Sequence, residues 1–343
     1  MRKLLNTLFV TSDDAYLSLD GENVVIRKED QPNARYPLHN LEAICTFGYK
    51  GTSPALMKAC TERNISLTYL NKNGKYLASV TGETKGNVVL RKEQYRISDD
   101  DYRSVVVSKN FILGKIYNQK WILERATRDY PLRVNVDKLK EVSRSLSDSL
   151  KVMRTVERLD ILRGMEGQAA VQYNSVFNEL ILQQKEHFSF KGRSRRPPLD
   201  LVNALLSFCY TLLSNDVKSA LETVGLDPYV GFMHQDRPGR ASLALDMMEE
   251  LRGVYADRFV LSLINKKIVN HKGFQYKENG AVIMNDDTRK KLIVAWQERK
   301  QDKIQHPFLN EKINWGLVPH AQALLLARYI RGDLDEYPPF LWK

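Results

Sequence analysis

Cysteine is scarce in this chain, and long hydrophobic runs are missing. The three cysteines lie far apart and form no CxxC spacing, which argues against a disulfide framework or a zinc cluster. The six histidines form no HxH or HExxH pair, so the helix-borne zinc motifs are absent as well. No apolar run is long enough to cross a bilayer, and the N-terminus lacks the features of a signal peptide. We therefore expect a cytoplasmic protein with reduced thiols and no membrane partner.

Positive charge exceeds negative charge by a wide margin. The 343 residues include 52 Lys and Arg against 41 Asp and Glu, a formal net charge of +11. An excess of this size on a soluble protein indicates a polyanionic partner, most often nucleic acid. The alternative is an enzyme that is merely basic, and composition alone leaves both open.

The first part of the chain predicts strands and turns. Hairpin and loop turns are expected at 20–23, 71–74 and 81–84, and Ser53 followed by Pro54 predicts the start of a helix that runs to about Arg63. Short β-rich runs occur at 4–11, 15–19, 24–28, 41–47, 65–70 and 76–80. Few helices fit this region, so we predict a small β-sandwich-like domain.

After about Tyr95 the pattern becomes helical. Apolar residues recur at helical spacing in the runs 111–128, 137–173, 199–214, 242–257, 288–303 and 317–331. The length of the chain is typical of two domains, and the linker falls between Gly82 and Asp101. We therefore predict an α+β protein, with a β-rich domain at 1–92 and a mostly α-helical domain at 93–343.

A dense basic loop separates two of the predicted helices. Residues 191–198 read Lys-Gly-Arg-Ser-Arg-Arg-Pro-Pro. Arginine side chains suit phosphate oxygens, and Gly192 and Ser194 leave the loop flexible enough to order on binding. The plainer alternative is a solvated surface loop. Given the overall charge, we favour phosphate contacts from Lys191, Arg193, Arg195 and Arg196.

Glu166 is the most unusual position in the helical region. On a helix it shares an apolar face with Leu162 and Tyr173, and this face should point inward. A carboxylate buried there needs a cation close by. That cation is either a metal ion or a basic side chain, such as Arg163, Arg240 or Arg252.

A second group of polar residues surrounds a Gly- and Pro-rich turn at 231–240. His234 lies in this turn, and Asp246 and Glu249 follow three residues apart on the next predicted helix, so their carboxylates can converge. With Glu166 they offer one imidazole and two or three carboxylates, a donor set that suits Mg²⁺ or Mn²⁺ better than zinc. Each residue taken singly is more simply a surface or salt-bridge residue. Together with the basic loop they indicate metal-dependent phosphoryl transfer, with His234 as a ligand or a proton shuttle.

Two segments resemble a known family. Residues 163–173 contain Arg-Gly-Met-Glu-Gly-Gln-Ala-Ala and Tyr173, and residues 231–250 contain Gly-Phe-Met-His, Arg-Ala-Ser-Leu-Ala-Leu-Asp and Met-Met-Glu-Glu. Over essentially its whole length, the chain resembles the CRISPR-associated spacer integrases, the larger subunit of the complex that inserts new spacers. The resemblance implies a metal-dependent DNA endonuclease and integrase.

The resemblance also implies roles for particular residues. Glu166, His234 and Glu249 would be catalytic and would bind Mg²⁺ or Mn²⁺, with Asp246 as a supporting or alternative ligand. The last acidic position is often Asp in relatives, whereas here it is Glu249. We also expect DNA contacts from Arg240, beside those of the basic loop.

The family resemblance further implies partners and a reaction. Family members form homodimers through the β-rich domain, and two dimers flank a dimer of a small ferredoxin-like CRISPR adaptation protein. The 3′-hydroxyl of the new spacer would attack a phosphodiester at the repeat border, so the substrates are the double-stranded DNA of the prespacer and of the CRISPR repeat. Two alternatives stay open: a structure-selective DNA repair nuclease, and a non-catalytic DNA-binding scaffold in which Glu166 forms a structural salt bridge.

Overall fold

The computed structural model describes residues 6–12, 14–29, 31–63, 65–70, 76–80, 82 and 88–343. The predicted turn at 71–74 lies outside these residues, as does most of the turn predicted at 81–84. The chain divides into two compact units. The first comprises Met1–Lys85, Arg289–Asp302 and Asn314–Gly316, and the second comprises Gly86–Thr288, Lys303–Ile313 and Leu317–Lys343.

The first unit contains two sheets. One is mixed, in the order β1-β5-β6-β7, with β1, β5 and β6 parallel and β7 antiparallel to β6. Its strands are β1 (Asn6–Val10), β5 (Leu41–Thr46), β6 (Ser66–Leu70) and β7 (Tyr76–Val80). The other sheet is antiparallel and consists of β2 (Tyr16–Asp20), β3 (Asn23–Arg27) and β4 (Ala34–Pro37). The predicted hairpin at 20–23 is confirmed by the pairing of β2 with β3.

Helix α1 (Pro54–Glu62) connects β5 to β6, because parallel neighbours need a crossover between them. It begins as predicted: the Ser53 hydroxyl accepts a hydrogen bond from the Leu56 amide at 3.2 Å. The core of the unit gathers side chains from both sheets and from α1, namely Leu17, Val24, Ile44, Leu56, Cys60 and Leu67. Most of α9 (Asp286–Gln301) also belongs to this unit, and Gln297 Nε2 donates to the Thr7 carbonyl at 3.0 Å.

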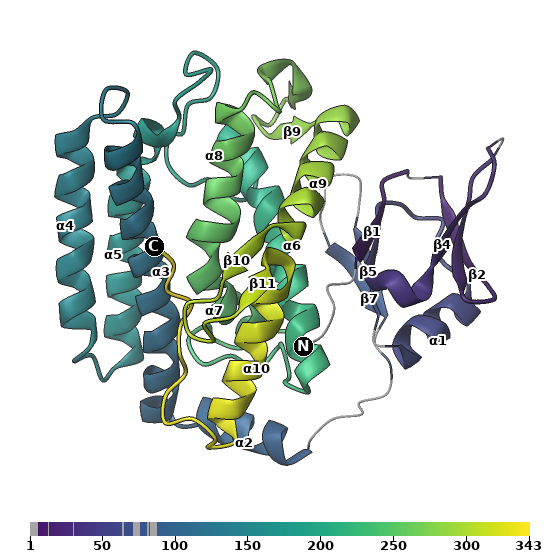
Figure 1. The fold of residues 1–343 in the computed structure, drawn as a ribbon, viewed down its shortest axis with the longest axis horizontal. Helices are drawn as coiled ribbons and strands as arrows, with labels where there is room; N and C mark the ends of the chain where they lie inside the picture. Colours follow the sequence, from purple (N-terminus) through teal and green to yellow (C-terminus); the bar gives the residue numbers. More distant parts are fainter. Residues whose placement is uncertain are drawn as a thin grey trace. The chain divides into compact units, whose positions relative to one another are not determined.

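The second unit is mostly helical. Helices α3, α4 and α5 pack side by side, and α7 packs against both α3 and α6 (Figure 1). Its helices are α2 (Val88–Ser98), α3 (Asp101–Asp129), α4 (Val136–Met153), α5 (Leu159–Ser175), α6 (Leu201–Val224), α7 (Ser242–Leu251), α8 (Arg258–Asn265) and α10 (Val318–Ile330). The predicted α+β class is thus confirmed. No helix among the described residues has the length and apolar character to cross a membrane.

Several elements differ from their predicted form. The run predicted as one helix at 137–173 is two helices, α4 and α5. The helix predicted at 242–257 passes from α7 into a π-helical segment, η3 (Arg252–Asp257), before α8. Two hairpins of three-residue strands were missed, β8 (Phe274–Tyr276) with β9 (Val282–Met284) and β10 (Lys303–Gln305) with β11 (Lys312–Asn314). Strands this short carry too little alternation to be recognised.

A buried network ties the C-terminal segment to α3 and α7. The Glu250 carboxylate, 0% exposed, accepts hydrogen bonds from Tyr337 Oη, from Gln322 Nε2 at 3.0 Å and from the Phe340 amide at 2.7 Å. Asn118 Nδ2 of α3 donates to the carbonyls of Glu250 and Phe340, at 2.8 and 2.7 Å. Burial raises the pKa of Glu250 to about 7, although these hydrogen bonds lower it.

The approach of α3 to α7 requires a glycine. A Cβ atom at Gly114 would lie 2.8 Å from Glu250 Cβ, closer than Cβ atoms pack, and 3.2 Å from Pro339 Cβ, which is also a tight contact. This contact places Lys115, the next residue of α3, beside the residue that precedes Glu250 on α7.

Candidate active site

Glu166 lies on the inward face of α5, as predicted. Leu162 and Tyr173 of the same face are at most 1% exposed, whereas the Glu166 side chain keeps 23% of its surface exposed. The cation beside it is the ammonium of Lys115 on α3, with which Glu166 Oε1 forms an ion pair. The need for a nearby cation was read correctly from the sequence, but Lys115 was not identified.

Lys115 joins Glu166 to Glu249. Its side chain is 2% exposed, and Nζ also lies 2.8 Å from Glu249 Oε2. The other oxygen of Glu249 lies 2.5 Å from Arg252 Nη2. Burial by itself raises the pKa of Glu249, but Arg252 and Lys115 outweigh it and lower the pKa to about 2. Glu249 is therefore a buried carboxylate that stays ionised because two cations hold it.

Asp246 organises the loop that carries His234. Its Oδ2 accepts hydrogen bonds from the amides of Phe232 and Met233 at 2.7 and 2.9 Å. Its Oδ1 accepts from the His234 amide at 3.0 Å and lies 2.5 Å from His234 Nδ1. With both oxygens used in this way, Asp246 holds the His234 ring at Nδ1, and Nε2 has no hydrogen-bond partner in the part of the chain that the structure describes.

The loop around His234 is packed tightly on its neighbours. A Cβ atom at Gly231 would lie 2.7 Å from Ser242 Cβ and 2.8 Å from Asp246 Oδ2, so glycine is required at this position. From α5, Arg163 Nε donates to the Met233 carbonyl at 2.9 Å. The loop is therefore fixed by α5 on one side and by α7 on the other.

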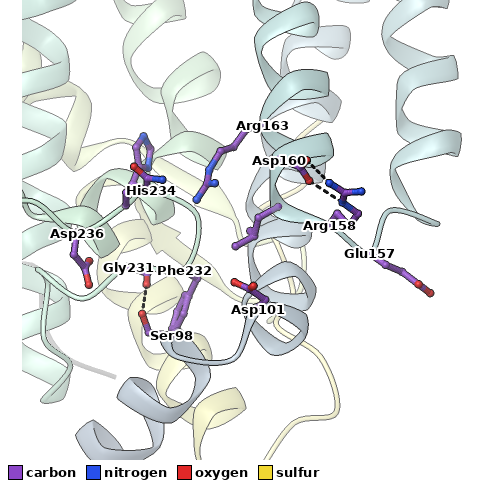
Figure 2. A pocket seen from close by; sticks show the side chains of 12 residues that line it. Ser98, Asp101, Glu157, Arg158, Asp160, Arg163, Gly231, Phe232, His234 and Asp236 are labelled. Carbon is purple, nitrogen blue, oxygen red and sulfur yellow. Dashed lines mark hydrogen bonds and ion pairs between the residues drawn. The ribbon is translucent and has the colours of Figure 1, made fainter.

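His234 also lines a pocket of about 480 Å³ (Figure 2). Its wall carries both signs of charge, from Asp101, Glu157, Arg158, Asp160, Arg163 and Asp236. Figure 2 shows the Arg158–Asp160 ion pair, at 2.7 Å, and the hydrogen bond from Ser98 Oγ to the Gly231 carbonyl, at 2.7 Å. A space of this size beside His234 can receive part of a substrate.

The basic loop divides into inward and outward residues. The Arg193 guanidinium points inward, donating to Asn203 Oδ1 at 2.7 Å and to Ser207 Oγ at 3.1 Å. Asn203, 0% exposed, also donates to the Gly192 carbonyl at 2.8 Å and so fastens the base of the loop. The outward side chains are exposed and are those of Lys191, Arg195 and Arg196. Arg240, beyond His234, is half-buried.

Tyr210 links the basic loop to Glu249. The centre of its ring lies 5.1 Å from the guanidinium of Arg193 and 4.9 Å from that of Arg252. Its hydroxyl donates to Asp257 Oδ1 at 2.6 Å. Burial raises the pKa of Asp257 to about 6, although Tyr210, Arg252 and Arg193 lower it.

Asp257 should make folding stability depend on pH. In the unfolded chain its pKa is 3.8, whereas in the folded protein it is about 6. Between these values the folded state holds a proton that the unfolded state has lost, so the stability present below pH 4 is lost as pH rises through 6. An Asp257→Asn variant cannot ionise at this position. As pH rises from 4 to 7, the wild type should lose stability that the variant keeps. The free energy of unfolding of the variant minus that of the wild type should therefore increase by up to about 3 kcal/mol. Guanidinium unfolding of both proteins across this range measures the difference, and a flat difference would show that Asp257 titrates alike in both states.

The donor set fits a hard divalent ion in its chemistry. Two carboxylates and one imidazole are available from Glu166, Glu249 and His234, and neither Glu166 Oε2 nor His234 Nε2 has a hydrogen-bond partner among the described residues. The same part of the chain holds no three His, Cys, Asp or Glu side chains grouped closely enough to hold a metal ion. The Lys115 ammonium lies between the two glutamates instead.

A family model described as CRISPR associated protein Cas1 matches residues 8–298. The chain belongs to the Cas1 family. Among its relatives, CRISPR-associated endonuclease Cas1 1 of Chlorobaculum tepidum is 49% identical over 343 residues, which is 100% of both chains. The family resemblance carried by residues 163–173 and 231–250 is confirmed.

Solved structures show the Cas1 fold in this chain. A casposase bound to integration product has a TM-score of 0.83 at 22% identity and covers 99% of this chain and 95% of that chain. A chain of a Cas6-RT-Cas1–Cas2 complex has a TM-score of 0.82 at 21% identity and covers 100% of this chain and 36% of that chain. At these identities the likeness concerns the fold alone.

Proposed function

We propose that this Cas1 chain is a metal-dependent DNA endonuclease and integrase. It would insert new spacer DNA into a CRISPR array when a 3′-hydroxyl attacks a phosphodiester at the repeat border. The observation that carries the proposal is the meeting of Glu166 from α5 and Glu249 from α7 on one ammonium, in a family whose relative is named an endonuclease. Two acidic side chains from separate helices that converge on one point can supply carboxylate ligands to a metal ion in phosphoryl transfer.

Glu166, His234 and Glu249 would hold Mg²⁺ or Mn²⁺. When bound, the ion supplies charge neutralisation for the phosphodiester and its leaving oxygen. Asp246 keeps the His234 ring oriented, and Arg252 keeps Glu249 ionised and in place. Each of these supporting contacts is made before substrate arrives, which reduces the reorganisation that the reaction needs.

The surface next to Glu166 is open to DNA. A Cβ atom at Gly164 or Gly167 of α5 would meet no described atom within 4 Å, so a nucleic acid backbone can come close to the helix. Lys191, Arg195 and Arg196 would contact backbone phosphates, and Arg240 lies on the loop beyond His234. Arg193 would hold the loop from inside rather than contact DNA.

The partners follow from the family. The chain would form a homodimer through its β-rich domain, 1–92, and use the catalytic domain, 93–343, on prespacer and repeat DNA. A small ferredoxin-like CRISPR adaptation protein would join two such dimers. In support, the Cas6-RT-Cas1–Cas2 structure contains a chain of this fold in a complex with Cas2.

A joining assay tests the proposal against its alternatives. The protein and its small CRISPR partner would be incubated with a short duplex bearing 3′-hydroxyls and a supercoiled plasmid with the repeat. We expect covalent joining at the repeat borders with Mg²⁺ or Mn²⁺ and none with EDTA. Cleavage of branched DNA without joining would indicate a repair nuclease instead, and DNA binding without either reaction would indicate a scaffold.

The outward arginines should control the salt dependence of DNA binding. Removing the two phosphate contacts of Arg195 and Arg196 by substitution with Ser should reduce the slope of log affinity against log salt by about 2. Metal binding should be unchanged, because neither side chain contacts Glu166 or Glu249. Fluorescence anisotropy at several salt concentrations measures the slope. As a control, substituting Arg144 and Lys151 of α4 removes the same formal charge from another part of the surface. An equal reduction of the slope in both double variants would contradict a specific role for the loop.

A further inference from the structure

Lys115 occupies an unusual position for a lysine. Its side chain is 2% exposed, on a face of α3 that also carries the buried Phe111 and Ile112. Burying an ammonium is costly unless anions meet it, and here Glu166 and Glu249 do so. The two anions are the same carboxylates that the proposed function assigns to a metal ion.

The charges of this cluster already balance. Lys115 and Arg252 supply two positive charges, and Glu166 and Glu249 supply two negative charges. A divalent ion that entered the cluster would add two positive charges next to the Lys115 ammonium, and the Asp246 carboxylate behind His234 could compensate only one of them. At a separation of about 4 Å, the repulsion between the ion and the ammonium amounts to several kcal/mol even at an effective dielectric constant of about 20. Metal binding to the protein alone is therefore opposed.

DNA changes this balance. Each phosphodiester brings one negative charge, so a phosphate placed at the cluster compensates one of the two positive charges of a bound ion. The side chain of Lys115 can then turn toward the phosphate, while its backbone stays in place because Gly114 packs directly on Glu250 and Pro339. The ion has a route to the cluster through Glu166, the more exposed of the two glutamates at 23% against 4%.

We infer that Lys115 is an internal counter-cation that holds Glu166 and Glu249 together without metal and makes metal binding depend on bound DNA. The inference rests on the proposed function, because it takes these two carboxylates as metal ligands. It makes Lys115 a positioning residue for the reaction. By linkage, metal must then strengthen DNA binding by the same factor by which DNA strengthens metal binding.

Electron paramagnetic resonance of Mn²⁺ tests this without an activity measurement. Bound Mn²⁺ would be counted for the full-length protein with and without a short duplex, and the Glu166→Ala protein with the same duplex would correct for Mn²⁺ held by DNA alone. We expect the wild type to bind Mn²⁺ at least about tenfold more tightly with DNA than without it. Lys115→Met should bind Mn²⁺ about tenfold more tightly than the wild type in the absence of DNA. The difference between its Mn²⁺ affinities with and without DNA should be smaller than in the wild type. Lys109→Met, on the same helix, should behave as the wild type does.

The outcomes separate the two proposals. If the wild type binds no Glu166-dependent Mn²⁺ even with DNA, the proposed function fails. If Glu166-dependent binding occurs but is equally tight with and without DNA, or if Lys115→Met gains no affinity, only the counter-cation role fails. Lys115→Gln serves the same purpose should the Met variant not fold, and the comparison of the wild type with and without DNA stands without any variant.

Discussion

A Glu166→Gln variant should lose metal-dependent strand joining by about a thousandfold or more while staying folded. The amide keeps the shape of the carboxylate but removes the charge that would bind the ion. Lys115 would still pair with Glu249, whose Oε2 lies 2.8 Å from its ammonium, so the packing between α3 and α7 should persist. Initial rates of joining in Mg²⁺ and in Mn²⁺ measure the effect.

A matched control for this experiment lies on α4. Glu141 is exposed, and Glu141→Gln removes the same charge by the same chemical change. This control should join DNA at the wild-type rate. Normal joining by Glu166→Gln would remove Glu166 from the reaction and leave its ion pair with Lys115 as a structural contact.

The second large effect concerns stability. Glu250→Ala should lower the free energy of unfolding by about 3–5 kcal/mol, because it leaves the buried Tyr337 Oη and the Phe340 amide without their acceptor, removes one acceptor of Gln322 Nε2 and opens a cavity. Guanidinium unfolding near pH 7 measures the loss. Limited proteolysis should also cut the variant within 331–343, since the network that holds this segment is gone.

The exposed Glu141 again offers a comparison. Glu141→Ala should change the free energy of unfolding by less than about 0.5 kcal/mol. If Glu250→Ala is as stable as this control and its C-terminal segment as resistant to protease, then the carboxylate of Glu250 does not anchor the segment.

The sequence predicted the parts of the site that depend on local spacing. The inward face of α5, the cap of α1 at Ser53 and the position of His234 ahead of Asp246 and Glu249 all follow from residues within one or two helical turns. Helix faces and caps are determined by such neighbours, so they can be recognised without a structure. The roles of Glu166, His234 and Glu249 as metal ligands stay a prediction until metal binding is measured.

Contacts between distant segments could not be predicted in the same way. Lys115 precedes Glu166 by 51 residues, and no periodicity connects them. The sequence does contain an indication of this contact. Lys115 follows Phe111 by four residues and Ile112 by three, so it is a charged residue on an apolar helix face, as Glu166 is. The inward turn of Arg193 was equally hidden, since its acceptor Asn203 lies on the following helix. The break between α4 and α5 has no Gly or Pro to mark it.

Glu249 and Glu250 are consecutive residues with separate duties. One faces the cluster of Lys115 and Arg252, and the other anchors the end of the chain through Tyr337 and Phe340. Successive side chains on a helix point about 100° apart, so a single turn of α7 makes both sets of contacts in different directions. Displacement of the C-terminal segment would remove the hydrogen-bond donors of Glu250 and loosen the same turn of α7 that positions Glu249. The contacts of the last dozen residues are thereby coupled, through one turn of α7, to the placement of the Glu249 carboxylate.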